Sequence, residues 1–379
     1  MRYPLTEEQL LIQQNAREFA ERYVEPEATN IDRQGAHPED IIKKLAEHDF
    51  FGLPFPAEYG GVEAGFLSYI LAVQEISRAS ASVGSILINH CSLAAYSLYR
   101  WGTPEQKERF LPALCRGEKL GAFALYEPGA AVGCGEQKVV ATKNDKGYVL
   151  NGRKYFVGNG GVADVYITFA LTDPEKGLKG LSAFIVEKGA PGLSVVRQIE
   201  KMGLRGFQTA ELAFDGVEVS RDALLGPENG ALAVLKEALA LERISAAAQI
   251  AGIVQAALQE SVKYAKDRVQ FGRPIAQFPA VQKMIADMSA GLHLMKLAVY
   301  STADLVDKGE PFEVEAAVVH MLAAKAGQNA CIDAIQVHGG YGYSQDLIVE
   351  RLFRDVKGAL IADSLLELPE RLVAENALA

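Results

Sequence analysis

The sequence predicts an α+β fold in which a small β domain separates two helical domains. Apolar residues recur with the period of an α-helix up to about residue 120 and again from about residue 229. Between these regions lie short runs rich in β-branched and aromatic residues, separated by glycine and proline. The chain has 379 residues, 49% of them hydrophobic, which is enough to bury the cores of two or three domains. We expect an N-terminal helical domain over residues 1–120, a central β-barrel or sandwich over 121–228 and a C-terminal four-helix bundle over 229–379.

Helical signals dominate the N-terminal region. Thr6 and Gln9 match a capping box, which predicts the start of the first helix. Apolar residues then recur at positions 12, 16, 19 and 23, on one helical face. Further helices are expected over 89–101 and 104–111.

The central region reads as a series of short strands. We expect them at residues 121–126, 139–143, 148–157, 165–171, 181–186, 193–196 and 211–214. The pair Asn151-Gly152 favours a two-residue hairpin turn, because a type I′ turn needs positive φ at both positions. Seven short strands are typical of a compact sandwich or barrel.

Long helices return after the strands, over 229–267, 277–308 and 312–338, with a last helix from near Asp346 that has one possible break. Long antiparallel helices with wide apolar faces usually form a bundle that also packs against other subunits. The sequence therefore predicts an oligomer.

Charge and cysteine content narrow the possible partners. The net charge of -10 argues against nucleic acid and anionic membrane surfaces. No segment approaches the roughly 18 uninterrupted apolar residues of a membrane span, and the N-terminus has no apolar core of a secretory signal. The four cysteines are scattered without a CxxC pair, so we expect a reducing cytoplasm and no metal site. His90 and His338 lack a metal-ligand pattern and are interpreted as structural.

The stretch from Asp267 to Met288 contains a corner between two helices. Arg268 ends an alanine-rich helix, and the run Phe271-Gly272-Arg273-Pro274 cannot continue it, because proline lacks the amide hydrogen. An aromatic ring, a glycine and two arginines suit a flat, anionic ligand. The alternative is a helical hairpin with a solvated arginine.

A glycine-rich run, Gln336 to Gly342, follows a helix of small residues. Paired glycines let a backbone approach a phosphate closely, and exposed N–H groups can then bind it. The run does not match GxGxxG and no strand precedes it, which argues against a Rossmann site. The alternative is an ordinary glycine-rich helix end.

Two acidic residues lie among apolar neighbours and are candidate bases. Glu242, followed by Arg243, interrupts an otherwise apolar helix, and Asp363 stands in the run ALIADSLLEL. Burial among apolar groups raises the pKa of a carboxyl group and lets it act as a base near neutral pH. The alternative for each is a charged group that faces solvent.

Taken in order, these motifs resemble the acyl-CoA dehydrogenase family. The resemblance rests on QFGRPIAQFPAVQKMIADM, QVHGGYGY, VERLFRDVK, KMGLRG and the central EPGA with NGRKYFVGNGG, and it extends over nearly the whole chain. It implies an FAD flavoprotein of fatty acid metabolism that removes the α-proton and the β-hydride of an acyl-CoA thioester. It also implies a homotetramer, built as a dimer of dimers, and an electron-transfer flavoprotein as the electron acceptor.

The resemblance also implies roles for individual residues. Three groups of residues are implied to bind FAD. Those over the flavin ring are Leu125, Tyr126, Phe156, Val157 and Gly158. Those at the corner, which reaches a neighbouring subunit, are Arg268, Phe271 and Phe278, and those at the pyrophosphate turn are Gln336, Val337, Gly339 and Gly340. Those implied to lie near the substrate are Val132, Gly133, Arg243 and Ser364. Glu242 and Asp363 match two positions at which different branches of the family keep the catalytic carboxylate, and we favour Glu242 because aspartate is one methylene shorter.

Several departures from the family pattern cluster around the expected flavin. Threonine or serine residues usual in the family are replaced by Tyr126, whose phenol still offers a donor, and by Val132, Gly158 and Leu365, which have no hydroxyl. The usual glutamine after Phe278 is proline. Each lost hydroxyl removes about 1 kcal/mol of net hydrogen bonding. We therefore expect an acyl-CoA dehydrogenase or an enoyl-CoA reductase. The alternatives are a weakly catalytic subunit of a heteromeric complex and an acyl-CoA oxidase variant.

Overall fold

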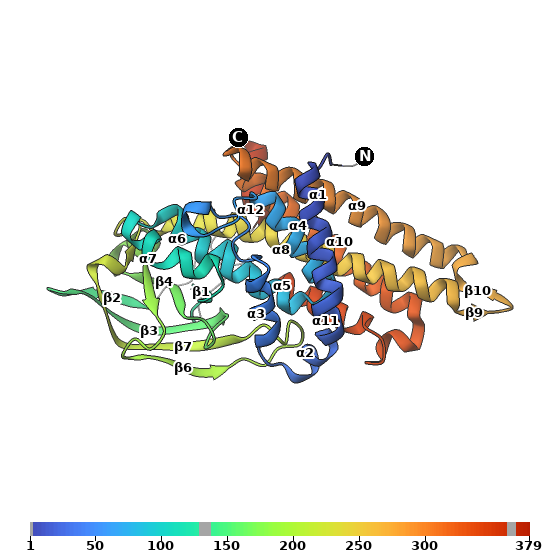
Figure 1. The fold of residues 1–379 in the computed structure, drawn as a ribbon, viewed down its shortest axis with the longest axis horizontal. Helices are drawn as coiled ribbons and strands as arrows, with labels where there is room; N and C mark the ends of the chain where they lie inside the picture. Colours follow the sequence, from blue (N-terminus) through green and yellow to red (C-terminus); the bar gives the residue numbers. More distant parts are fainter. Residues whose placement is uncertain (1–2, 129–137, 362–368) are drawn as a thin grey trace.

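The computed structural model describes residues 3–128, 138–361 and 369–379 (Figure 1). The N-terminal part is helical, as predicted. Its α-helices are α1 (Glu7–Phe19), α2 (Ala28–Gln34), α3 (Glu39–Glu47), α4 (Phe66–Ala79), α5 (Ala81–Ile88), α6 (Tyr96–Trp101) and α7 (Pro104–Cys115), with short helical turns η1 (Ala20–Val24), η2 (Glu25–Glu27) and η3 (Ala57–Tyr59).

The capping box at the start of α1 is confirmed. The Gln9 amide N–H donates to Thr6 Oγ1 at 3.2 Å, and the Thr6 N–H donates to Gln9 Oε1 at 3.0 Å. The predicted helix over 89–101 begins with a π-helical turn, η4 (Asn89–Ala95), and continues as α6. The wider turn of η4 is buried between α5, α8 (Ala231–Asp267) and the first strand.

The central strands also lie close to the predicted positions. They are β1 (Gly121–Ala124), β2 (Val140–Lys143), β3 (Gly147–Gly158), β4 (Val165–Leu171), β5 (Leu181–Glu187), β6 (Leu193–Gln198), β7 (Thr209–Ser220) and the two-residue β8 (Leu224–Leu225), with the turns η5 (Pro174–Gly180) and η6 (Arg221–Ala223). The sequence did not predict β8, which is too short to give a period.

One sheet contains all of these strands, in the order β6-β7-β3-β1-β4-β5-β8. Strands β1 and β2 lie end to end between β3 and β4, because each of them pairs with both. One face of the sheet encloses its own apolar core, which includes Tyr148, Phe184 and Phe214. The other face carries Phe123 and Phe169 into the helical core. The sheet therefore lies to one side of the helices (Figure 1).

The predicted hairpin turn at Asn151-Gly152 is wrong. Both residues lie inside β3, where the pairing with β7 shifts register between Leu150 and Gly152. A Cβ atom at Gly152 would lie 2.8 Å from Val139 Cγ2, so the glycine is needed for a close approach in a bulge. The hairpin turn lies at Asn144 instead, whose N–H donates to the Gly147 carbonyl at 2.9 Å.

The C-terminal helices confirm the predicted order. They are α8, α9 (Pro279–Lys308), α10 (Glu313–His338), α11 (Val349–Ala359) and α12 (Pro369–Leu378). Between α8 and α9 the chain forms a small hairpin of β9 (Val269–Gln270) and β10 (Arg273–Pro274), followed by η7 (Ile275–Gln277). The sequence predicted a corner there but no strands. Among the described residues, no helix is both long and apolar enough to cross a membrane.

Candidate active site

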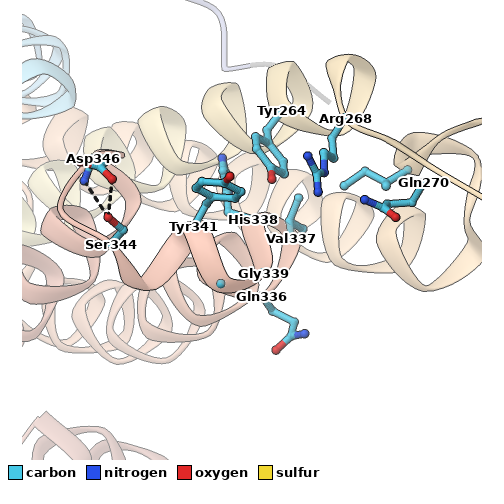
Figure 2. Close-up of a pocket in the computed structure, with 12 residues that line it drawn as sticks. Tyr264, Arg268, Gln270, Gln336, Val337, His338, Gly339, Tyr341, Ser344 and Asp346 are labelled. Carbon is cyan, nitrogen blue, oxygen red and sulfur yellow. Dashed lines mark hydrogen bonds between the residues drawn. The ribbon is translucent and has the colours of Figure 1, made fainter.

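An open pocket of about 550 Å³ lies where α10 ends beside the last turns of α8. The residues that line it are Tyr264, Arg268, Gln270, Ile275, Gln336, Val337, His338, Gly339, Gly340, Tyr341, Ser344 and Asp346. Figure 2 shows Tyr264 and Arg268 reaching from α8 toward the end of α10. The structure therefore brings together Arg268 and the glycine-rich run, which are far apart in the sequence.

The end of α10 depends on Gly339 for its shape. Gly339 has φ 58° and ψ -140°, a conformation that a side chain disfavours. The turn η8 (Gly339–Tyr343) follows directly. A Cβ atom at Gly339 or Gly340 would meet nothing within 4 Å, so the backbone faces open space there. A phosphate could therefore approach the backbone of this turn closely.

The pocket wall is held by His338 and Tyr264. His338 Nδ1–H donates to the Ala334 carbonyl at 2.7 Å, and its ring centroid lies 4.4 Å from that of Tyr264. The Arg268 guanidinium lies 6.0 Å from the centre of the Tyr341 ring. His338 thus has structural contacts, as interpreted from sequence, while also lining the pocket.

These residues fit the diphosphate of FAD. Arg268 is exposed and supplies positive charge, and the two glycines supply room for phosphate oxygens. The Gln336 side chain points away from Arg268 in Figure 2, so the two do not converge on one point within a single chain. Val337 is buried, which leaves its backbone as the part that a ligand can reach.

The hairpin β9–β10 projects at the end of the molecule opposite the sheet (Figure 1). Its turn consists of Phe271 and Gly272, with φ 51° and 79°. Phe271 is 93% exposed and contacts only Phe278 among aromatic rings of the described residues, at 6.2 Å between centroids. The Arg273 guanidinium lies 4.4 Å from the centre of the Phe278 ring. A non-glycine residue at positive φ is costly, so the surrounding hairpin must hold Phe271 in this conformation.

The segments predicted to cover the flavin, Leu125–Tyr126 and Phe156–Gly158, are called here the cover segments. They lie side by side, because the Tyr155 N–H donates to the Tyr126 carbonyl at 2.7 Å. Leu125 and Val157 are buried in apolar cores, whereas Phe156 is 49% exposed. Phe156 also has φ 51°, at an irregularity in the pairing of β3 with β7. An exposed aromatic ring at this point is available to a flat ligand.

An ion pair that the sequence did not reveal supports the cover segments. Lys154 Nζ lies 2.6 Å from Glu127 Oε1 and donates to the Leu125 carbonyl at 3.0 Å. Glu127 Oε2 accepts the N–H groups of Lys138 and Val139. Burial lowers the pKa of Lys154 to about 8, against the raising effect of Glu127. Lysine and glutamate are common on exposed strand edges, so their spacing carried no signal of burial.

Glu242 and Arg243 lie near the middle of α8, and both are buried. The alternative of a solvent-facing charged pair is therefore wrong. Arg243 is close enough to His320 on α10 to help lower the pKa of that histidine to about 4, with burial as the larger cause. Asp363 and Ser364 lie outside the described residues, as do Val132 and Gly133.

Comparisons with known proteins agree with this arrangement. Residues 6–118, 122–217 and 229–378 match the acyl-CoA dehydrogenase N-terminal, middle and C-terminal domains. The chain is 42% identical over 378 residues to an acryloyl-CoA reductase (NADH) of Anaerotignum propionicum, with 99% of this chain and 96% of that protein covered.

Two solved structures are similar over their whole length. A butyryl-CoA dehydrogenase from Megasphaera elsdenii has a TM-score of 0.96 and 38% identity, with 100% of both chains covered. A chain in a structure described as an electron transferring flavoprotein of Acidaminococcus fermentans has a TM-score of 0.96 and 39% identity, again with 100% of both chains covered. Full-length identity at this level, together with all three domain matches, shows that the chain belongs to the acyl-CoA dehydrogenase family of FAD flavoproteins, oxidoreductases that act on CH–CH bonds.

Proposed function

We propose that this chain binds FAD and interconverts an acyl-CoA thioester and its α,β-unsaturated counterpart. The pocket at the end of α10 carries the proposal, because Arg268, Gly339 and Gly340 remain in place there despite the departures elsewhere. Bound FAD would supply the two-electron acceptor, or the donor when the reaction runs as a reduction. The similarity to an acryloyl-CoA reductase supports the reductive direction as a second candidate.

The direct test is to purify the chain and record its visible spectrum. We expect a bound flavin that is bleached by an acyl-CoA or reoxidised by an enoyl-CoA from a panel of thioesters. A chain that folds without flavin would instead support a weakly catalytic subunit of a heteromeric complex. Oxygen consumption coupled to acyl-CoA turnover would support the oxidase variant.

Glu242 is the proposed base for the α-proton. The residue is only 8% exposed, and a buried carboxylate can act as a base for a proton within hydrogen-bond reach. Asp363 is the second candidate. A carboxylate withdrawn by one methylene is displaced by about 1 Å, which can cost roughly a hundredfold in rate.

Two conservative variants separate these candidates. Glu242→Gln should slow flavin reduction by substrate at least roughly a hundredfold, because it removes the base and keeps the size of the side chain. Asp363→Asn should have a much smaller effect. Stopped-flow measurements at equal flavin content give the comparison. A large effect of Asp363→Asn with a small effect of Glu242→Gln would assign the base to Asp363.

The proposed assembly is a homotetramer, a dimer of dimers. The outer surfaces of α9 and α10 expose Leu294, Leu322 and Ile332 by 62%, 51% and 45%. The sheet that contains Phe156 and the hairpin that contains Phe271 lie on opposite sides of the helices in Figure 1, which favours an FAD that contacts both residues across a subunit interface. Both observations support an assembly in which the hairpin of one subunit reaches the cover segments of another.

The proposed electron partner is an electron-transferring flavoprotein, supported by the similarity to a chain in a structure described as one. The proposed compartment is the cytoplasm. The described cysteines Cys91, Cys115 and Cys331 are free and buried, which is compatible with a reducing environment.

A further inference from the structure

Gly158 ends β3 in the second cover segment, and two side chains from elsewhere already fill the space beside it. A Cβ atom at position 158 would lie 2.7 Å from Asn89 Nδ2 and 2.4 Å from Phe207 Cζ. Both distances are shorter than real Cβ contacts, so a larger residue at 158 would have to displace these groups. Asn89 and Phe207 thus occupy the volume that a side chain at position 158 would take.

The loop that carries Phe207 is anchored on both sides of the ring. Lys201 Nζ donates to the Phe207 carbonyl at 2.7 Å, and the Gly206 N–H donates to Ser82 Oγ at 3.2 Å. The Phe207 N–H donates to the Leu204 carbonyl at 3.1 Å. With the backbone held at these points, the Phe207 ring stays beside Gly158.

Asn89 has an unusual hydrogen-bonding state for a buried residue. It lies in η4 and is 8% exposed, yet its Oδ1 has no hydrogen-bond partner among the described residues. Its neighbours do have partners: His90 contacts the Leu114 carbonyl, and Ser92 Oγ lies 2.8 Å from Ser245 Oγ. Keeping the Asn89 Oδ1 atom buried without a hydrogen bond is costly, so a ligand toward which the carboxamide turns would compensate the cost.

We propose that Asn89 contacts the flavin, with its carboxamide as the hydrogen-bonding group that residue 158 does not supply. The Asn89 carboxamide fills the volume that a side chain at position 158 would take. Because position 158 belongs to a cover segment, a group in that volume would face the bound flavin. Asparagine has both a donor and an acceptor, whereas an apolar residue there would leave this edge of the ring without a polar contact. The inference rests on the proposed function, since it requires FAD beside the cover segments.

The test is Asn89→Leu, a change of similar size that removes both polar atoms. With the full-length protein, we expect a shifted absorption spectrum of the bound flavin and a roughly tenfold increase in the dissociation constant for FAD. The matched control is Ser68→Ala on α4, which removes another buried polar atom without a partner among the described residues. It should leave spectrum and affinity unchanged.

A second variant keeps the test decisive if Asn89→Leu does not fold. Asn89→Ala should produce the same spectral shift, and adding Gly158→Ser with Phe207→Ala should restore the spectrum by placing a hydroxyl in the same volume. A wild-type spectrum and FAD affinity in the Asn89 variants would overturn the inference. A change only in the KM for the thioester would also overturn the inference, because it would show that Asn89 contacts the acyl group and not the flavin. Absence of flavin from the wild-type protein would instead overturn the proposed function itself.

Discussion

At the scale of single residues, the Lys154–Glu127 ion pair supports the cover segments. Both side chains are essentially inaccessible, at 0% and 1% exposure. Removing one partner leaves the other charge buried, a change that usually costs about 3–5 kcal/mol. We expect Lys154→Met to lower the free energy of unfolding by that amount and to reduce flavin content, because the Leu125 carbonyl also loses its donor. Denaturant unfolding and flavin absorbance measure the two effects.

The double variant Lys154→Met/Glu127→Leu is the control for that prediction. Replacing both charges with apolar groups removes the unpaired carboxylate, so it should recover part of the lost stability. A double variant less stable than Lys154→Met would show that the backbone contacts of Glu127 with Lys138 and Val139 matter more than the charge pair.

At the scale of elements, His90 joins the helical N-terminal part to the sheet. Its Nδ1 accepts the Gly121 N–H at the start of β1, at 2.9 Å, and its Nε2 donates to the Leu114 carbonyl in α7, at 3.1 Å. The bond from the Gly121 N–H needs the neutral ring, because a protonated Nδ1 cannot accept it. Burial lowers the pKa of His90 to about 4 from its usual 6.5. The stability that His90 provides is therefore fully present above pH 6.5 and is lost as the pH falls toward 4.

We expect the free energy of unfolding to fall by about 1.4 kcal/mol per pH unit through this group between pH 6.5 and 4, because only the unfolded chain takes up the proton. His90→Gln should be less stable at pH 7 but should show a shallower pH dependence across this range. Unfolding at fixed protein concentration and several pH values measures the difference in slope. Equal slopes in the two proteins would assign the acid sensitivity to other groups.

At the scale of the whole molecule, the hairpin and the sheet lie far apart, so an FAD that contacts both would couple cofactor binding to subunit assembly. We expect Arg268→Ala to lower FAD retention and to reduce the tetramer fraction in light scattering together, because the residue lines the pocket from which the hairpin extends. The matched control is Arg116→Ala, an exposed arginine that pairs with Glu118 and lies outside both the pocket and the hairpin. A monomeric wild-type protein at micromolar concentration, or unchanged flavin content in Arg268→Ala, would contradict the proposed shared site.

Local patterns were enough to predict much of the architecture. The capping box at Thr6, the periodic apolar helices and the β-rich centre are properties of neighbouring residues, and each appears close to its predicted place. The same holds for the end of α8 at Arg268, where glycine and proline prevent a longer helix. The domain limits at residues 120 and 228 stay a prediction.

Contacts between distant residues were decided only by the tertiary structure. Asn151-Gly152 has the composition of a turn, yet pairing of β3 with β7 and close contact with Val139 make it a bulge within a strand. The burial of Lys154 with Glu127, and the filling of the space at Gly158 by Asn89, depend on segments that meet only after folding. The sequence by itself determined the family, the order of elements and the candidate residues, because these follow from local periodicity and recognisable motifs. Which side chains share a site was set by the tertiary packing, since burial and distance are properties of the folded chain.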